Sequence, residues 1–141
     1  MTPDQTIRLD ELLAQISEPA ATRPVSAWAE ENVFFNEPKI SGPFSLGGRH
    51  YLREPIDNWN NPALTDQILC FSTRSGKTRI LFVGAAWRIR HNPMRCLWTK
   101  PATHGPGGAR NDSKTKFLPM LRASPSLAKL IPSGALRHDF T

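Results

Sequence analysis

The stretch from 70 to 79 reads CFSTRSGKTR and holds the residues best suited to bind a phosphate. A phosphate-binding loop follows the pattern G-x-x-x-x-G-K-[ST], and Gly76, Lys77 and Thr78 match its last three positions. In such a loop, backbone N–H groups and a helix N-terminus surround the phosphates, the lysine neutralises them and the hydroxyl binds Mg²⁺. Phe71 stands where the pattern has its first glycine, so the match is incomplete.

The candidate site is the whole loop, with Arg74 as a bidentate phosphate donor and Thr78 as the Mg²⁺ ligand. Its residues are Ser72, Thr73, Arg74, Ser75, Gly76, Lys77 and Thr78. The alternative is that a common triplet happens to begin a helix and that Arg74 is simply solvent-exposed. The position of the triplet between an apolar run and an amphipathic stretch favours a phosphate site.

The elements around the loop predict a βαβ unit. Residues 67–71 (QILCF) form a short apolar run that suits a buried strand. Residues 77–90 have the spacing of an amphipathic helix, and 95–98 (RCLW) form a second apolar run. Strand, loop, helix and strand in this order predict an α/β fold with part of a parallel sheet.

Helices flank this unit in the expected organisation. We predict helices at 6–17, 25–32, 51–59, 111–122 and 125–131, with Ser26 capping the second and Pro119 kinking or splitting the fourth. The segment 33–48 is rich in Pro and Gly and predicts an extended arm or loop. The chain therefore divides into an N-terminal helix with a linker, 1–24, and an incomplete domain of P-loop NTPase type, 25–141.

The charge of the chain is unevenly distributed. Residues 1–66 contain 5 Lys and Arg against 10 Asp and Glu, whereas residues 67–141 contain 13 against 2. A basic half suits a polyanion such as nucleic acid or a nucleotide. The alternative is a solvated basic surface balanced by the acidic half.

Other features narrow the class of protein. No apolar run is long enough to cross a bilayer, and the N-terminus has no secretory pattern. Two cysteines, Cys70 and Cys96, fit a reducing compartment and are expected to be buried. The four histidines have no metal-ligand spacing. The four tryptophans are expected in or beside the core; they are Trp28, Trp59, Trp87 and Trp98.

Four stretches together resemble the N-terminal part of the large subunit of phage terminase, in the GpA family. They are VSAWAEEN at 25–32, SGP at 41–43 followed by YLREPID at 51–57, STRSGKT at 72–78, and SKTKFLPMLRASPSL at 113–127. Their order and spacing agree with the family over about 25–132, which is most of the chain. The family's loop also lacks the first glycine, which accounts for Phe71, although a basic residue is common near that point.

The resemblance implies an ATP-driven motor that packages viral DNA, with ATP and Mg²⁺ bound at a deviant Walker A loop. Tyr51 would stack on the base, although a core aromatic is the alternative. Leu52 replaces a glutamine thought to sense adenine, and a leucine offers no hydrogen bonds to a base edge. The implied partners are double-stranded viral DNA, the terminase small subunit and, in the full-length protein, the portal of the procapsid. The implied location is the host cytoplasm, with no membrane association.

The sequence also departs from a complete motor. After Pro101 we find no apolar strand ending in Asp or Glu and no carboxylate cluster for a two-metal nuclease. We therefore expect the ATP-binding half without the hydrolysing half, so that enzyme activity stays open. The alternatives are a non-catalytic module that binds DNA or docks the small subunit, with helix 6–17 as the partner helix, and an inactive prophage remnant.

Overall fold

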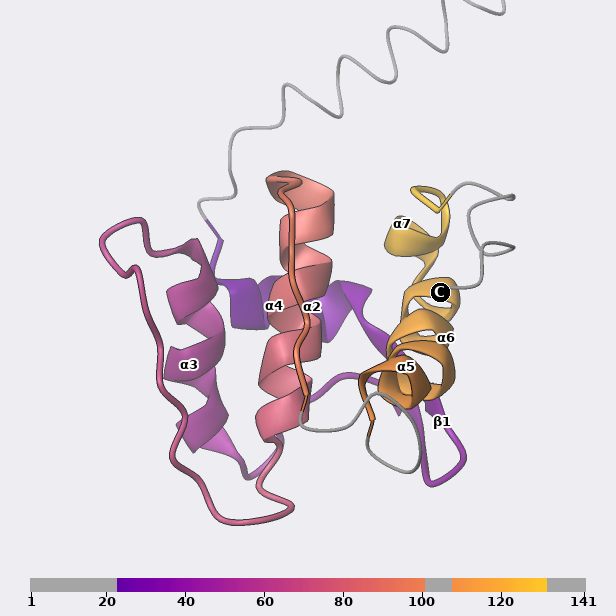
Figure 1. The fold of residues 1–141 in the computed structure, drawn as a ribbon, viewed down its shortest axis with the longest axis horizontal. Helices are drawn as coiled ribbons and strands as arrows, with labels where there is room; N and C mark the ends of the chain where they lie inside the picture. The colour runs from indigo at the N-terminus through magenta and orange to yellow at the C-terminus, as the bar shows by residue number, and fades with distance from the viewer. Residues whose placement is uncertain (1–22, 101–107, 132–141) are drawn as a thin grey trace, which may run out of the picture.

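The computed structural model describes residues 23–100 and 108–131; the predicted helix at 6–17 lies outside them. In Figure 1, α4 stands at the centre, α3 lies on one side of it, and α5 and α6 lie on the other, while α2 crosses behind. The elements are α2 (Val25–Asn32), β1 (Phe34–Glu37), β2 (Ile40–Pro43), a 3-10 turn (His50–Leu52), α3 (Arg53–Asp57), a 3-10 turn (Asn58–Asn60), α4 (Lys77–His91), α5 (Ala109–Asp112), a π-helical turn (Ser113–Phe117), α6 (Leu118–Ala123) and α7 (Pro125–Ala128).

Helix α4 is the centre of the hydrophobic core. Ile80, Val83 and Trp87 are buried at the spacing of one helical face, and Phe82 and Ala86 widen that face. The helix has 15 residues and ends at His91, one residue beyond the predicted end. None of the helices in the described part of the chain is long and apolar enough to span a membrane.

Helix α2 has the predicted bounds, but its N-terminus is capped from another helix. Ser26 lies inside the helix and gives no side-chain cap. Its backbone N–H instead donates to Asp57 Oδ1 at the end of α3, at 2.8 Å. An acceptor for a free N–H of the first turn stabilises a helix, so the expected cap at Ser26 is wrong and Asp57 takes that role.

The segment expected as an extended arm contains a β-hairpin. β1 pairs with β2 antiparallel, in a register that sets Phe35 opposite Gly42 and Glu37 opposite Ile40. Pro38 and Lys39 form the turn between the strands. Phe35 and Phe44 are buried with ring centroids 6.0 Å apart. This two-stranded sheet is the only sheet within 23–100 and 108–131.

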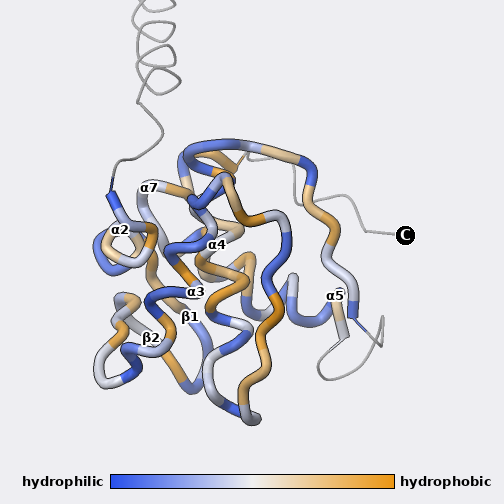
Figure 2. Tube along the Cα trace, turned by 90° about the vertical axis from the view of Figure 1, so that its left-hand side faces the viewer, coloured by the Kyte–Doolittle hydropathy of each residue, from blue (hydrophilic) through white to orange (hydrophobic). Residues whose placement is uncertain are grey.

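The two predicted strands of the βαβ unit are coil in this structure. Residues 67–71 and 95–98 have no partner strand among the described residues. Each segment packs one side against the core, through Leu69 in the first and Trp98 in the second, while its other side is exposed to solvent. Ile68 is 87% exposed and Leu97 is 89% exposed. Figure 2 shows coil with apolar stretches crossing the face in front of α4. The described fold is therefore mixed helix and strand, without a parallel sheet.

The two cysteines lie in these coil segments. Cys70 and Cys96 are both exposed, so the expectation that they are buried is wrong. The tryptophan prediction is confirmed: Trp28 and Trp87 are buried, and the other two pack partly buried against the core.

The predicted helix at 111–122 is divided, as Pro119 suggested. A π-helical turn at 113–117 separates α5 from α6, and Pro119 sits in the first turn of α6. Proline lacks the N–H that an α-helix interior needs, and a wider turn before it relieves the clash with the preceding turn. α7 begins at Pro125 as predicted.

Candidate phosphate-binding loop

The loop that precedes α4 turns into the helix at Gly76. Gly76 has φ 99°, a left-handed conformation that side chains rarely adopt. A Cβ on Gly76 would lie 3.1 Å from Leu52 Cδ1, which is a tight contact. Both conditions select glycine at the point where the phosphate pattern has one.

The side chain of Lys77 hydrogen-bonds to the backbone at the start of the loop. Its Nζ donates to the carbonyl oxygen of Phe71 at 2.7 Å and to that of Ser72 at 2.6 Å. The hydroxyl of Ser75 donates to the same Ser72 carbonyl, at 2.7 Å. The backbone of the loop therefore curls around the ammonium of Lys77.

The N-terminus of α4 is open toward the loop. No side chain caps it, and its first turn contains no acidic residue. The carbonyl of Gly76 accepts the N–H groups of Arg79 and Ile80, at 2.9 and 3.3 Å. Within the described residues, the hydroxyl of half-buried Thr78 makes no hydrogen bond. The positive end of the helix dipole, free N–H groups and a free hydroxyl thus lie together, a combination that suits an anion with a bound cation.

Tyr51 lies against the loop, as its inclusion in the candidate site requires. Its hydroxyl donates to the carbonyl of Ser75 at 3.0 Å, and its ring meets that of Phe71 edge to face, with centroids 5.8 Å apart. Tyr51 is 51% exposed, so it is not a core residue. Its neighbour Leu52 is only 2% exposed and packs under Gly76. The leucine therefore supports the loop from below.

The tip of the loop is exposed. Ser72, Thr73 and Arg74 all face solvent. Arg74 has φ 60°, a positive value that is uncommon outside glycine. The backbone therefore turns sharply at Arg74. The Arg74 side chain is in contact with solvent.

Arg79 is a residue beside the loop that the sequence patterns did not single out. Its guanidinium carbon lies 5.2 Å from the centre of the Phe35 ring. Partial burial lowers the pKa of Arg79, the positive charge of Arg49 lowers it further, and Glu37 acts in the opposite direction. The one signal in the sequence was a second basic residue two positions after Lys77.

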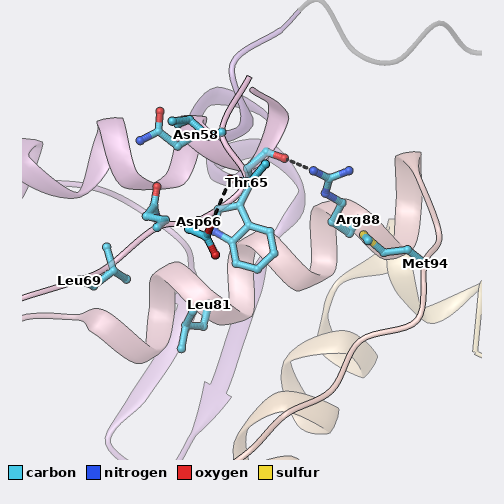
Figure 3. A pocket seen from close by; sticks show the side chains of 10 residues that line it. Asn58, Thr65, Asp66, Leu69, Leu81, Arg88 and Met94 are labelled. Carbon is cyan, nitrogen blue, oxygen red and sulfur yellow. Dashed lines mark hydrogen bonds between the residues drawn. The ribbon is translucent and has the colours of Figure 1, made fainter. Parts of the chain in front are cut away.

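A pocket of about 320 Å³ lies elsewhere along α4, and no residue of the loop lines it. Figure 3 shows Thr65 and Asp66 of the long coil on one side of it, and Leu81 and Arg88 of α4 on another. Arg88 donates to the carbonyl of Trp59 at 2.8 Å, which ties the 3-10 turn at Asn58–Asn60 to α4. The described residues contain no group of three or more His, Cys, Asp or Glu suited to a metal ion.

Comparison with known proteins gives one match. The model of the family described as phage terminase large subunit gpA, ATPase domain, matches residues 39–139. No curated protein and no solved structure matches the chain. The matched range contains the whole loop, Tyr51 and Arg79.

Proposed function

Because this chain belongs to the family of phage terminase large subunit gpA ATPase domains, we propose that residues 72–78 are a deviant Walker A loop that binds ATP. In this proposal the bound nucleotide drives DNA translocation by the terminase to which the domain contributes. The observation that carries the proposal is the hydrogen bonding of Lys77 Nζ to the carbonyls of Phe71 and Ser72 at an uncapped helix start.

Each loop residue has a role in the proposed binding. The ammonium of Lys77 has three donors; two hydrogen-bond to the Phe71 and Ser72 carbonyls, and the third would reach a terminal phosphate. The free N–H groups at the start of α4 hydrogen-bond to phosphate oxygens, as at other helix N-termini. Arg74, at the exposed tip, adds a guanidinium on the solvent side.

Two further residues would hold the Mg²⁺ and the base. Thr78 fits a Mg²⁺ ligand, because its hydroxyl follows the lysine directly and makes no hydrogen bond within the described residues. The cation would offset phosphate charge. The half-exposed ring of Tyr51 offers one face to a base, and its hydroxyl keeps it against Ser75. Leu52 lies below the loop and makes no base contact in this proposal.

We further propose that 67–71 and 95–98 are strands of the family's parallel sheet once neighbouring strands are present. Each segment already packs one side against the core and exposes apolar residues to solvent on the other side. Parallel strands are covered on both faces, so they are apolar on both. Hydrogen exchange in a form of the protein that includes those neighbouring strands tests this proposal: amides of 67–71 protected as strongly as those of α4 support a sheet, and exchange at the rate of unstructured peptide contradicts it.

The proposed partners follow from the family. They are double-stranded viral DNA, the terminase small subunit and the portal of the procapsid, met in the host cytoplasm. The basic character of residues 67–141, with 13 Lys and Arg against 2 Asp and Glu, supports the DNA contact.

Titration with a fluorescent ATP analogue tests the nucleotide site. We expect the wild type to bind in the presence of Mg²⁺ and Lys77→Ala to lose at least tenfold in affinity, equivalent to about 1.4 kcal/mol. Lys39→Ala is the matched control, because Lys39 is an exposed lysine in the hairpin turn and not part of the loop. Equal affinity in the two variants would sink the proposal.

The uneven charge also favours a second function, that of a non-catalytic DNA-binding module. In that case DNA affinity is the same with and without Mg²⁺ and is unchanged in Lys77→Ala. Nucleotide binding is then absent from the wild type as well.

A further inference from the structure

We propose that the pocket beside α4 is a docking groove for the chain's own N-terminal segment, which the sequence predicts as a helix at 6–17. No residue of the phosphate loop lines this groove, so the inference is independent of the nucleotide site proposed above.

The groove has a largely apolar lining that is open to solvent. Large apolar side chains of the 3-10 turn, the long coil and α4 line it; they are Trp59, Leu64, Leu69, Leu81 and Met94. Leu64 is 45% exposed and Met94 is 61% exposed, and Figure 3 shows Met94 and Leu81 at different sides of the pocket. Apolar residues that gather in an exposed groove are typical of a docking surface. The volume of about 320 Å³ suits side chains from one face of a helix rather than a whole helix, which is about 10 Å wide.

The described chain begins next to this groove. The N–H of Ser26, in the first turn of α2, donates to Asp57 Oδ1 at 2.8 Å. The two residues that follow Asp57, Asn58 and Trp59, line the groove. Figure 1 shows the indigo start of the chain at the same end of α3. The N-terminal segment therefore joins the described fold beside one wall of the groove.

The length of chain before Arg23 is sufficient to reach along the groove. Residues 18–22 connect the predicted helix to Arg23, and five extended residues span up to about 17 Å. A helix over 6–17 is about 18 Å long. The segment can thus turn back and lie on the groove without any rearrangement of α2.

The segment also has an apolar face that fits such a groove. Leu9, Leu12, Leu13 and Ile16 follow the i, i+3, i+4, i+7 spacing, which places them on one side of a helix. A helix this short is only marginally stable alone in water, so it forms mainly where it can pack that face. Burying these side chains against Trp59 and Met94 removes apolar surface from water on both partners.

Charge favours the same occupant. Residues 1–22 contain four Asp and Glu against one Arg. The last turn of α4 is basic, with Arg88, Arg90 and His91, and Arg88 lines the groove. Attraction between an acidic segment and a basic groove end orients the segment and adds to the apolar packing.

Hydrogen exchange on the whole chain tests whether the segment is docked. We expect the amides of 9–16 to exchange about tenfold more slowly in the wild type than in Met94→Asp, which places a charge in the groove. Met94 is largely exposed, so the substitution leaves the core intact, and a thermal melt checks this. Ile40→Asp is the matched control, because Ile40 is an exposed apolar residue of β2 that does not line the groove.

Oxidation of Met94 by peroxide, read by mass spectrometry, tests the contact from the side of the segment. A docked segment shields the Met94 thioether, so we expect Leu13→Asp to speed its oxidation severalfold. Ala14→Asp is the matched control, since it adds the same charge on the side of the predicted helix opposite the four apolar residues.

Four results would overturn docking within one chain. The amides of 9–16 could exchange in the wild type as in unstructured peptide, or each variant could behave as its matched control does. Protection that falls on dilution would mean that a second copy supplies the segment. Protection that appears only after addition of the terminase small subunit would assign the segment to that partner.

Discussion

Ser124 shows how one buried hydroxyl joins distant parts of the chain. Its Oγ accepts the N–H of Phe34 at 2.9 Å and donates to the carbonyl of Met120 at 2.8 Å. We predict that Ser124→Ala destabilises the protein by about 1–3 kcal/mol, because a strand N–H is left unpaired away from water. Urea denaturation measures the change. Ser126→Ala is the control, since the buried hydroxyl of Ser126 has no hydrogen-bond partner among the described residues; an equal loss in both variants would refute this role for Ser124.

The indole of Trp59 packs so closely on α4 that position 84 has room only for glycine. A Cβ on Gly84 would lie 2.0 Å from Trp59 Cε2, which is far inside van der Waals contact. Gly84→Ala should therefore destabilise the protein by about 1–3 kcal/mol, although alanine is the better helix former. Gly48→Ala serves as the control, because a Cβ there meets nothing within 4 Å. A chemical melt in which Gly84→Ala equals or exceeds the wild type in stability would contradict this packing.

At the scale of single residues, the sequence predicted where the loop turns into α4, but not which residues pack against the loop. The start of α4 after Gly76 could be predicted, because the phosphate pattern places its glycine and lysine where a loop turns into a helix. The position of Leu52 under Gly76 could not, since a contact between segments this far apart in the chain depends on how turns and helices fold back. For the same reason, the Arg79 stack on Phe35 has no signature in the sequence.

At the scale of elements, α2 depends on a carboxylate from α3. Asp57 Oδ1 accepts the N–H of Ser26 in the first turn of α2. We predict that Asp57→Ala costs about 0.5–2 kcal/mol, the usual value of a lost helix cap. Glu54→Ala is the matched control, because Glu54 is an exposed acid on the same helix. Circular dichroism during urea unfolding measures both, and a Glu54→Ala loss as large as that of Asp57→Ala would count against the cap.

Helices were predictable and strands were not, for a physical reason. The helix at 77–90 satisfies its own backbone, so its apolar spacing is enough to place it. The segment 67–71 needs a partner strand, and none is present among the described residues. The hairpin was missed because Pro38 and Gly42 interrupt the alternation that marks a strand, while its pairing is set by the tight turn between Glu37 and Ile40.

At the scale of the whole molecule, Asp112 holds two parts of the chain together. Its carboxylate, 1% exposed, pairs with Lys116 at 2.7 Å and with Lys100 before the undescribed residues. Burial raises the pKa of Asp112, but the hydrogen bonds and charges of the two lysines outweigh burial, so the pKa lies below its ordinary 3.8. A lowered pKa contributes stability that is present above the ordinary value and is lost as the pH falls through the folded value.

The lowered pKa of Asp112 predicts how the stability of the protein changes with pH. Near neutral pH, Asp112→Asn should be less stable than the wild type by about 1–2 kcal/mol, less than for a fully buried pair because both lysines reach solvent. The difference in melting temperature should shrink as the pH falls below 3.8, where the wild-type carboxyl also loses its charge. Melts across the acid range measure it, and a difference that stays constant with pH would rule out the ion pairs as its source.

The claim that loop 72–78 binds nucleotide is tested most directly by a thermal melt of the chain with and without Mg²⁺ and a non-hydrolysable ATP analogue. At a ligand concentration of about 100 times Kd, binding adds about 2.7 kcal/mol to the stability of the folded state. We predict that the melting temperature of the wild type rises by several degrees, as that energy implies for a domain of this size, and that Lys77→Ala shows no rise. A cooperative melt of the wild type that does not move with nucleotide would contradict the claim.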